Sequence, residues 1–240
     1  MNILVVNDDS IHAPGIALLA RAAMALGDVW VVAPAEQCSA MSQKLTIRDP
    51  LKVEKVDFPV AVKGAYKVSG TPVDCVKVAL HYILKEKPDY VFSGINDGFN
   101  AGFDIAYSGT LGAAFEAVMN GIPAIAFSND AGESLDTAEK YLADIARELI
   151  REGQAPGEVW NVNFPGLPPE DVKGILRERT IAPVQCYSEN YASQLQEDGS
   201  VILTSRGIRL NDGKHVPPDS DIAAVLGGYI SVGKVKSVVL

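Results

Sequence analysis

The stretch NILVVNDDSIHAPG, residues 2–15, decides the fold. Its apolar run over residues 3–6 is short and continuous, which is typical of a strand buried on both faces of a parallel sheet. Pro14 then stands near the start of a helix that we expect over residues 16–26, with Gly27 as its C-terminal stop. A buried strand that leads directly into a helix indicates an α/β fold.

The same alternation of strand and helix continues to about residue 165. Four more short apolar runs predict strands at residues 29–32, 90–92, 124–127 and 159–162. Residues with helical spacing predict helices that begin at Thr71, the expected N-cap, and that cover residues 111–119 and 136–150. Alternation at this spacing predicts a Rossmann-like, mostly parallel sheet with helices on both faces.

Two stretches depart from the alternation. Residues 45–68 read as short extended pieces, which we expect to form an antiparallel excursion from the core. After about residue 170 the alternation stops, and residues 180–215 resemble a long hairpin with its turn at Asp198-Gly199. We therefore assign residues 1–170 to a catalytic core.

Residues 171–240 are then an extended arm and tail, with a short helix over residues 221–226, and not an independent domain. A two-stranded arm buries little surface against itself, so we expect a partner subunit to support it and the arm and tail to serve in oligomerisation.

Composition limits the classes of function. The chain has 240 residues, of which 48% are hydrophobic and 21% are charged, and its formal net charge is −9. Such an acidic protein is not expected to bind nucleic-acid polymers or anionic membranes through its overall field. A small anionic substrate would need a site with its own local positive potential. No apolar run approaches the roughly 18 residues of a membrane span.

The cysteine pattern indicates the compartment. Cys38, Cys75 and Cys186 are isolated in the sequence and show no spacing typical of a disulfide framework or a thiolate zinc site. The first residues lead directly into a strand and carry no basic, cleavable leader. These features favour a cytoplasmic protein in a reduced compartment.

Unusual polar sequence follows three of the expected strands. These segments are NDDS at residues 7–10, APAEQCSAMS at 33–42 and SGINDGFNAGFDIAYSGT at 93–110. The carboxyl ends of parallel strands meet at one edge of a sheet, where ligands bind in open α/β folds. The sequence therefore predicts that the three segments together form the functional site.

Asp8 and Asp9 are the main feature of the first segment. A single aspartate there could cap the next helix or shape a turn. An adjacent pair after a buried strand favours a hard divalent cation, because carboxylate oxygens suit such ions and the cation removes their mutual repulsion. No glycine fingerprint follows the strand, which argues against a Rossmann-type dehydrogenase. His12 is the only histidine close enough in sequence to test as a further ligand.

The third segment combines glycines with amide and hydroxyl side chains. Glycines let the backbone approach a ligand closely, and the segment ends in residues 107–110 (YSGT), which open a helix. A helix N-terminus with small residues favours an anion. A turn-rich surface loop is the competing interpretation. We interpret Asp104 as a structural acid that bonds loop amides, and Cys38 as a small filler; Ser39 and Ser42, taken alone, are turn formers.

Four stretches together resemble the SurE survival-protein family of metal-dependent phosphatases. They are the NDD and APG sequence at the start, the AP…S…S…LT loop, SGTPVDCV at residues 69–76, and SGIN…GFN…YSGTLGAA. The resemblance is strong over about residues 1–130. It continues through NFPG at residues 163–166 and GYISV at residues 228–232.

The resemblance implies an activity. Members of that family hydrolyse nucleoside monophosphates to nucleoside and phosphate, some also act on polyphosphate, and they form dimers or tetramers by exchanging C-terminal elements. We therefore expect a 5′-nucleotidase with one divalent cation, Mg²⁺ or Mn²⁺, per subunit; 3′-monophosphates and short polyphosphate are further candidate substrates. The alternative is a nucleotide-binding or sensing protein with a structural metal and no turnover.

The resemblance also implies roles for individual residues. Carried over by position, the metal ligands are Asp8, Asp9, Ser39 and Asn96. Asn100 and the turn Ser108-Gly109-Thr110 then lie at the phosphate, and Asp8 is the candidate that orients the attacking water.

The sequence departs from the family pattern at Ser10 and Ala40, where the family usually has glycine. A non-glycine residue is strained wherever the backbone requires a positive φ. The arm carries Asn190-Tyr191-Ala192 in place of an aromatic Tyr-Trp pair, and the tail reads SVGKVKSVVL in place of a Thr-Pro-Leu-like ending.

Overall fold

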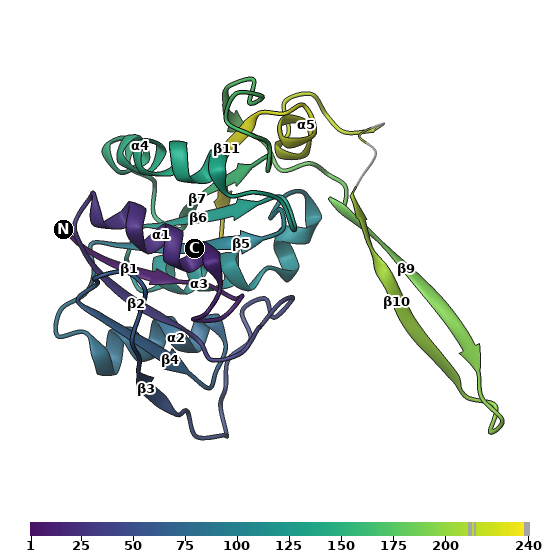
Figure 1. The fold of residues 1–240 in the computed structure, drawn as a ribbon, viewed down its shortest axis with the longest axis horizontal. Helices are drawn as coiled ribbons and strands as arrows, with labels where there is room; N and C mark the ends of the chain where they lie inside the picture. Colours follow the sequence, from purple (N-terminus) through teal and green to yellow (C-terminus); the bar gives the residue numbers. More distant parts are fainter. Residues whose placement is uncertain (211–212, 214, 238–240) are drawn as a thin grey trace.

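A nine-stranded, mostly parallel sheet forms the body of the molecule (Figure 1). The structure is a computed structural model, and it describes residues 1–210, 213 and 215–237. The strand order is β3-β4-β2-β1-β5-β6-β7-β11-β8. The parallel run across the middle consists of β4 (Gly64–Val68), β2 (Asp28–Pro34), β1 (Asn2–Val6), β5 (Tyr90–Asp97), β6 (Ala124–Asn129) and β7 (Glu158–Phe164). The predicted Rossmann-like fold is confirmed.

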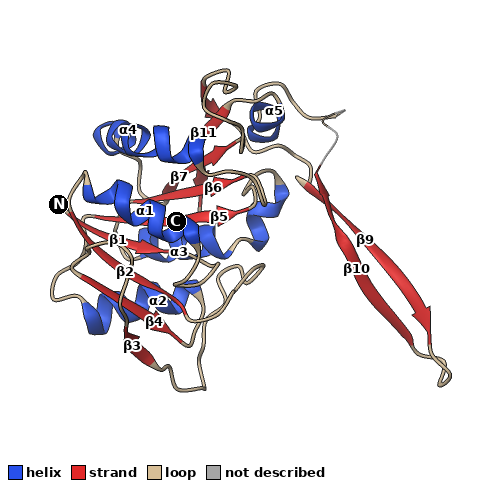
Figure 2. Ribbon diagram, in the orientation of Figure 1, coloured by secondary structure: helices blue, strands red, loops and turns tan. Residues whose placement is uncertain are grey.

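Helices cover both faces of this sheet (Figure 2). On one face lie α1 (Pro14–Met24) and α4 (Asp136–Glu152), and on the other lie α2 (Pro72–Val78), extended by the π-helical turn η1 (Ala79–Ile83), and α3 (Gly109–Met119). Side chains of β1 alternate between the two cores: Ile3 and Val5 pack with α1 and α4, whereas Leu4 and Val6 pack with α2 and α3. Because both faces are buried, the strand is apolar at every position from Ile3 to Val6. Each of these side chains contributes about 1.5–3 kcal/mol by its burial.

Local sequence sets the helix boundaries. Thr71 caps α2 in a reciprocal capping box: its hydroxyl accepts from the Asp74 N–H (3.3 Å), and the Asp74 carboxylate accepts from the Thr71 N–H (2.9 Å). Such a cap contributes about 1 kcal/mol. Pro14 occupies the first turn of α1, where its missing N–H costs nothing.

The expected antiparallel excursion over residues 45–68 is only partly right. The short strand β3 (Val53–Lys55) is antiparallel to β4, but β4 is parallel to β2 and extends the main sheet. Residues 45–49 form no strand. Their backbone is held by helix α2 instead, since the Thr46 N–H donates to the Asp74 carboxylate (3.1 Å) and the Thr71 hydroxyl donates to the Lys44 carbonyl (2.6 Å).

The C-terminal segment supplies both an arm and two strands of the main sheet. Strands β9 (Tyr187–Leu195) and β10 (Val201–Leu210) form the predicted hairpin, which extends away from the body (Figure 1). Around it lie β8 (Ile175–Arg179), α5 (Asp221–Leu226) and β11 (Ile230–Lys236); β11 pairs antiparallel with β7. Residues 211, 212 and 214 of the expected hairpin stretch and residues 238–240 of the tail lie outside the described residues.

The turn of the arm lies where the sequence placed it. Asp198 accepts from the Ser200 N–H (2.9 Å), and Gly199 adopts a φ of 83°. Leu195, Val201 and Leu203 are exposed on the arm. Among the described residues, no helix is both long enough and apolar enough to span a membrane.

Candidate active site

The three polar segments meet at the carboxyl edge of the sheet, as predicted. The Cys38 N–H, in the segment after β2, donates to the Asp8 carbonyl (2.7 Å). The Asp97 N–H, at the end of β5, donates to the Asp9 carboxylate (3.0 Å). Strand β1 lies between β2 and β5, so the acid pair occupies the centre of this edge.

Asp8 is a buried carboxyl group at the N-terminus of α3. It is 3% exposed, and its Oδ1 accepts from the Thr110 hydroxyl (2.6 Å). Burial raises the pKa of Asp8 from 3.8 to about 7; the Thr110 hydrogen bond opposes this rise, and the neighbouring Asp9 adds to it. Gly109 permits the close approach, because a Cβ there would lie 2.9 Å from Asp8 Oδ2.

Asp9 lies beside a second acidic strand end. Burial raises its pKa, and the charge of Asp97 adds to this effect, whereas hydrogen bonds from the Asp97 N–H and Gln37 lower it. Neither Asp8 nor Asp9 forms a salt bridge with a lysine, arginine or histidine within the part of the chain that the structure describes. Two adjacent, largely buried carboxylates thus lack a compensating cation from the protein.

The donor set around this pair fits a hard divalent cation. Asp8 and Asp9 offer carboxylate oxygens. Ser39 is exposed and follows Cys38, whose N–H bonds to the Asp8 carbonyl, so its hydroxyl would be a third oxygen donor. The Asn96 Nδ2 donates to the Gly98 carbonyl (2.7 Å), so Oδ1 is the atom of this amide that would ligate a metal. All four donors are oxygens, as Mg²⁺ and Mn²⁺ prefer. Among the described residues no cluster of three or more His, Cys, Asp or Glu side chains could hold a metal, so neutral oxygens are needed to complete this set.

Backbone strain is concentrated in the first two segments. Ser10 has a φ of 93°, Ala40 a φ of 56° and Ser42 a φ of 50°. These are left-handed conformations that favour glycine, so the departures from glycine at Ser10 and Ala40 do strain the chain. His12 is exposed, and its backbone N–H donates to the Ser10 hydroxyl (3.4 Å).

The turn from residue 108 to residue 110 opens α3, as predicted. The Ser108 hydroxyl caps the helix by accepting from the Leu111 N–H (3.0 Å), and Gly109 and Thr110 form its first turn. The N–H groups of a first helical turn have no acceptor within the helix, and they can bind an anion.

Asn100 is built into the loop between β5 and α3. Its side-chain Nδ2 donates to the Ser128 hydroxyl (2.7 Å). Its backbone carbonyl accepts from the side-chain amides of Asn161 (2.7 Å) and Asn163 (3.1 Å). The Asn163 Oδ1 also accepts from the Asn100 N–H (2.9 Å). Sequence reasoning missed these two asparagines of β7. The signal was present in WNVNF, where amide side chains interrupt an otherwise apolar, buried strand.

Two minor predictions are confirmed by the geometry. Asp104 is a structural acid, although the amide that its carboxylate binds belongs to Tyr187 of β9 (2.8 Å) and not to its own loop. Cys38 is a buried filler, and burial raises the pKa of its thiol, which disfavours a thiolate nucleophile.

A cavity of about 470 Å³ adjoins the acid pair. Asp9 and Asn96 line it together with Gln37, Asp97 and Glu133. It lies between the start of α1 and the loop after β6, at the point where the strand order reverses, which is the usual ligand position in such sheets. Its volume is within the range of small-molecule sites.

Comparison with known proteins gives concordant matches. The sequence profile described as "Survival protein SurE" matches residues 3–184. A protein named 5′-nucleotidase SurE from Geobacter sulfurreducens is 46% identical over 177 residues, which cover 72% of this chain and 66% of that protein. A protein named 5′/3′-nucleotidase SurE from Erwinia tasmaniensis is 40% identical over 239 residues, which cover 97% of this chain and 88% of that protein.

A solved structure agrees with these sequence matches. The crystal structure titled as the Sure protein from Aquifex aeolicus superposes with a TM-score of 0.84 at 37% sequence identity. The match covers 98% of this chain and 93% of that chain.

Proposed function

Because the chain belongs to the SurE survival-protein family, we propose that it is a 5′-nucleotidase that uses one divalent cation, Mg²⁺ or Mn²⁺, per subunit. It would hydrolyse nucleoside 5′-monophosphates to nucleoside and phosphate. The observation that carries this proposal is the pair of buried, uncompensated carboxylates, Asp8 and Asp9, against the N-terminus of α3.

Asp8, Asp9, Ser39 and Asn96 would hold the cation. When bound, the cation neutralises charge on the phosphate and lowers the pKa of a water molecule. The two carboxylates formally cancel a divalent charge, so the attraction for a phosphate dianion must come from other donors of the chain.

The first turn of α3 supplies those donors in our proposal. The Gly109 N–H would donate to a phosphate oxygen, since the Ser108 hydroxyl is already engaged with Leu111 and the Thr110 N–H with the Asp8 carboxyl group. We also place Asn100 at the phosphate. Its amide group has two N–H bonds, and only one is needed for Ser128.

Asp8 would orient the attacking water. Thr110 fixes one of its oxygens, which leaves Oδ2 to accept a hydrogen bond from water beside Gly109. The water oxygen bonds to phosphorus, the bond from phosphorus to the ribose oxygen breaks, and a proton from the water passes to the ribose oxygen. Phosphate and nucleoside are the products.

The nucleoside would occupy the 470 Å³ cavity, which shares Asp9 and Asn96 with the proposed cation site. The acidic side chains of Asp97 and Glu133 in its lining disfavour further phosphate groups, so we expect monophosphates to be preferred over short polyphosphate. Nucleoside 3′-monophosphates are a further candidate substrate, which the name of the Erwinia relative supports.

We also propose that the enzyme is a cytoplasmic dimer or tetramer. Exposed apolar side chains on the arm, such as Leu195, Val201 and Leu203, favour burial against another subunit. The three cysteines are unpaired, as expected in a reduced compartment. The net charge of −9 disfavours nucleic-acid polymers and anionic membranes as partners.

Phosphate release measured across a panel of nucleoside 5′- and 3′-monophosphates and short polyphosphate tests the proposal. We expect turnover of 5′-monophosphates with Mg²⁺ or Mn²⁺ and none after chelation. A nucleotide-sensing protein, the alternative, would bind nucleotide to saturation and release no phosphate.

A further inference from the structure

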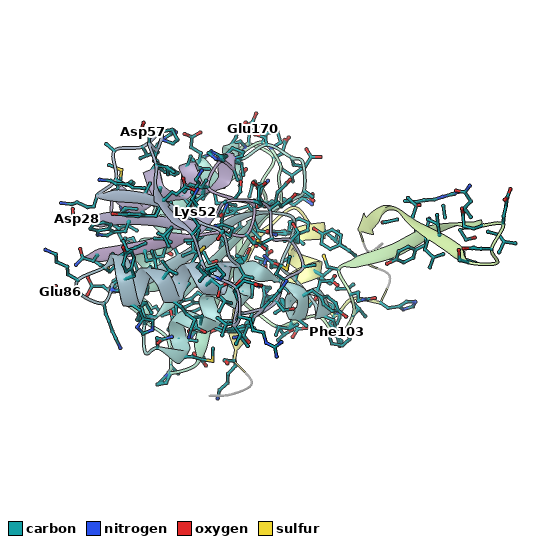
Figure 3. The ribbon with its side chains drawn as sticks, turned by 90° about the horizontal axis from the view of Figure 1, so that it is seen from below. Asp28, Lys52, Asp57, Glu86, Phe103 and Glu170 are labelled. Atoms are coloured by element: carbon teal, nitrogen blue, oxygen red, sulfur yellow. The ribbon has the colours of Figure 1, made fainter. Side chains whose placement is uncertain are left out.

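The root of the hairpin arm is bonded to the loop between β5 and α3, residues 98–108. The Phe99 N–H donates to the Tyr187 hydroxyl (2.6 Å), and the Phe103 N–H donates to the Val184 carbonyl (2.9 Å). The Tyr187 N–H donates to Asp104 (2.8 Å) from the same loop. Phe103 is labelled close to where the arm leaves the body (Figure 3).

The Tyr187 hydroxyl and the Asn96 amide flank one glycine. A Cβ added to Gly98 would lie 3.5 Å from the Tyr187 hydroxyl and 3.7 Å from the Asn96 Nδ2. The same Nδ2 donates to the Gly98 carbonyl, which orients the Asn96 side chain. Tyr187 therefore fixes the backbone immediately after Gly98, although it belongs to a different part of the chain.

A small separate core strengthens this junction. Phe99 and Ala101 of the loop pack with Ala182, Cys186 and Ile222 of the C-terminal segment, and the half-buried Tyr187 ring packs against them. Asp221 adds a polar clamp, because its two oxygens accept from the Gly102 N–H (2.9 Å) and the Ala182 N–H (2.9 Å). The loop is thus fastened to the arm and α5 as well as to the main sheet.

We propose that Tyr187 is a positioning residue for the active site. Its hydroxyl holds the Phe99 N–H, and through Gly98 it sets the orientation in which Asn96 presents its oxygen. This inference rests on the proposed function for the identity of the site. It goes beyond that function because it assigns a role to a residue of the arm. The geometry of the site then depends on the contacts between the arm and the loop after β5.

The Tyr187→Phe variant tests this role, because it removes the hydroxyl and keeps the ring. The Phe99 N–H then loses its acceptor, which lowers the ratio of correctly ordered to disordered loop about tenfold. We expect kcat for a nucleoside monophosphate to fall about tenfold with little change in KM. We also expect faster amide exchange over residues 96–103, unchanged exchange in β1 and β6, and weaker Mn²⁺ binding by calorimetry.

The matched control is Tyr82→Phe. Tyr82 is 79% exposed and belongs to η1, away from the site. We expect this variant to match the wild type in kinetics, amide exchange and Mn²⁺ binding.

A second variant separates the hydroxyl from the ring. If Tyr187 serves packing alone, Tyr187→Leu perturbs the loop and Tyr187→Phe matches the wild type in exchange and Mn²⁺ binding; that result overturns the inference. If both variants loosen residues 96–103, the inference stands. Should the wild type release no phosphate, the proposed function fails, and amide exchange and Mn²⁺ binding still decide the role of Tyr187.

Discussion

Two of the three loops that build the site, the loop after β1 and the loop after β5, differ in how their conformations are held. After β1, the chain carries buried carboxylates that lack an ionic partner, and Ser10 adopts a positive φ; Ala40 does the same in the neighbouring segment. In the loop after β5, the positive φ angles fall on Gly98 and Gly102, which adopt them readily.

The polar groups of the loop after β5 also have hydrogen-bond partners. Asn100 and Asp104 both find partners, and the backbone N–H groups of Phe99, Gly102 and Phe103 have acceptors. The comparison indicates that the loop after β5 is preformed, whereas the loop after β1 holds unfavourable free energy. The cation that we propose would relieve it.

The largest expected effect is a loss of catalysis when the loop after β1 is changed. Asp9→Asn removes a carboxylate that no other residue replaces, so we expect kcat/KM to fall by about 1,000-fold or more, equivalent to ~4 kcal/mol. Asp57→Asn is the control and should retain wild-type activity, because Asp57 is exposed and lies outside the three site segments (labelled in Figure 3). Normal phosphate release by Asp9→Asn would remove this carboxylate from the mechanism.

The next largest effect is a loss of stability when the loop after β5 is changed. A Cβ at Gly102 would lie 2.3 Å from the Val184 carbonyl oxygen, and the residue has a φ of 56°. Gly102→Ala should lower the free energy of unfolding by about 3 kcal/mol in urea titrations. Gly121→Ala, with a φ of 74° and nothing within 4 Å, isolates the cost of the dihedral angle at about 1 kcal/mol. Equal losses in the two variants would show that the loop is not closely packed on the arm.

A smaller effect is expected at Asp8, where a substitution should raise the free energy of unfolding instead of lowering it. Its pKa is about 7 in the folded, cation-free protein against 3.8 in the unfolded chain, so the folded state binds more protons between these values. The free energy of unfolding therefore falls as pH rises from about 4 to 7 and levels off above. In chelator at pH 8, Asp8→Asn should be more stable than the wild type by about 2 kcal/mol, although inactive.

The difference in the free energy of unfolding between Asp8→Asn and the wild type should shrink as the pH is lowered to 5, where the wild-type carboxyl group is largely protonated. Urea titrations at both pH values measure it. A gap that is the same at both pH values would contradict burial of an ionised Asp8.

The smallest expected effect is relief of strain. Ala40→Gly should raise the free energy of unfolding by about 1 kcal/mol, because glycine adopts a φ of 56° without a Cβ penalty. Ala25→Gly, at a φ of −70°, is the matched control and should lower it by about 0.5–1 kcal/mol. Destabilisation by both substitutions would show that the segment near Asp8 is not strained.

The fold could be predicted in large part because its signals are local. The apolar run of β1, the cap at Thr71 and the turn at Asp198-Gly199 each follow from a few neighbouring residues. The parallel pairing of β4 with β2 could not be predicted, because it joins residues more than 30 positions apart in sequence, such as Trp30 and Gly64.

The candidate site divides in the same way. The meeting of Asp8 with Thr110 followed from the rule that parallel strands end at one edge, and the strain at Ser10 and Ala40 was anticipated from their side chains. The support of Asn100 by Asn161 and Asn163 and of Phe99 by Tyr187 joins residues more than 60 positions apart in sequence. The local pattern WNVNF marks Asn161 and Asn163 as unusual in a buried strand, but it does not identify Asn100 as the residue that they bind.

The central claim is that the site at Asp8 and Asp9 is destabilised until a divalent cation binds. Thermal unfolding of the wild type and of Asp9→Asn at pH 8, with and without Mn²⁺, tests it most directly. At 100 times the dissociation constant, Mn²⁺ should stabilise the wild type by about 2.7 kcal/mol, a rise of roughly 5–10 °C in Tm, and should leave Asp9→Asn nearly unchanged. An equal shift in both proteins, or no shift in the wild type, would contradict the account.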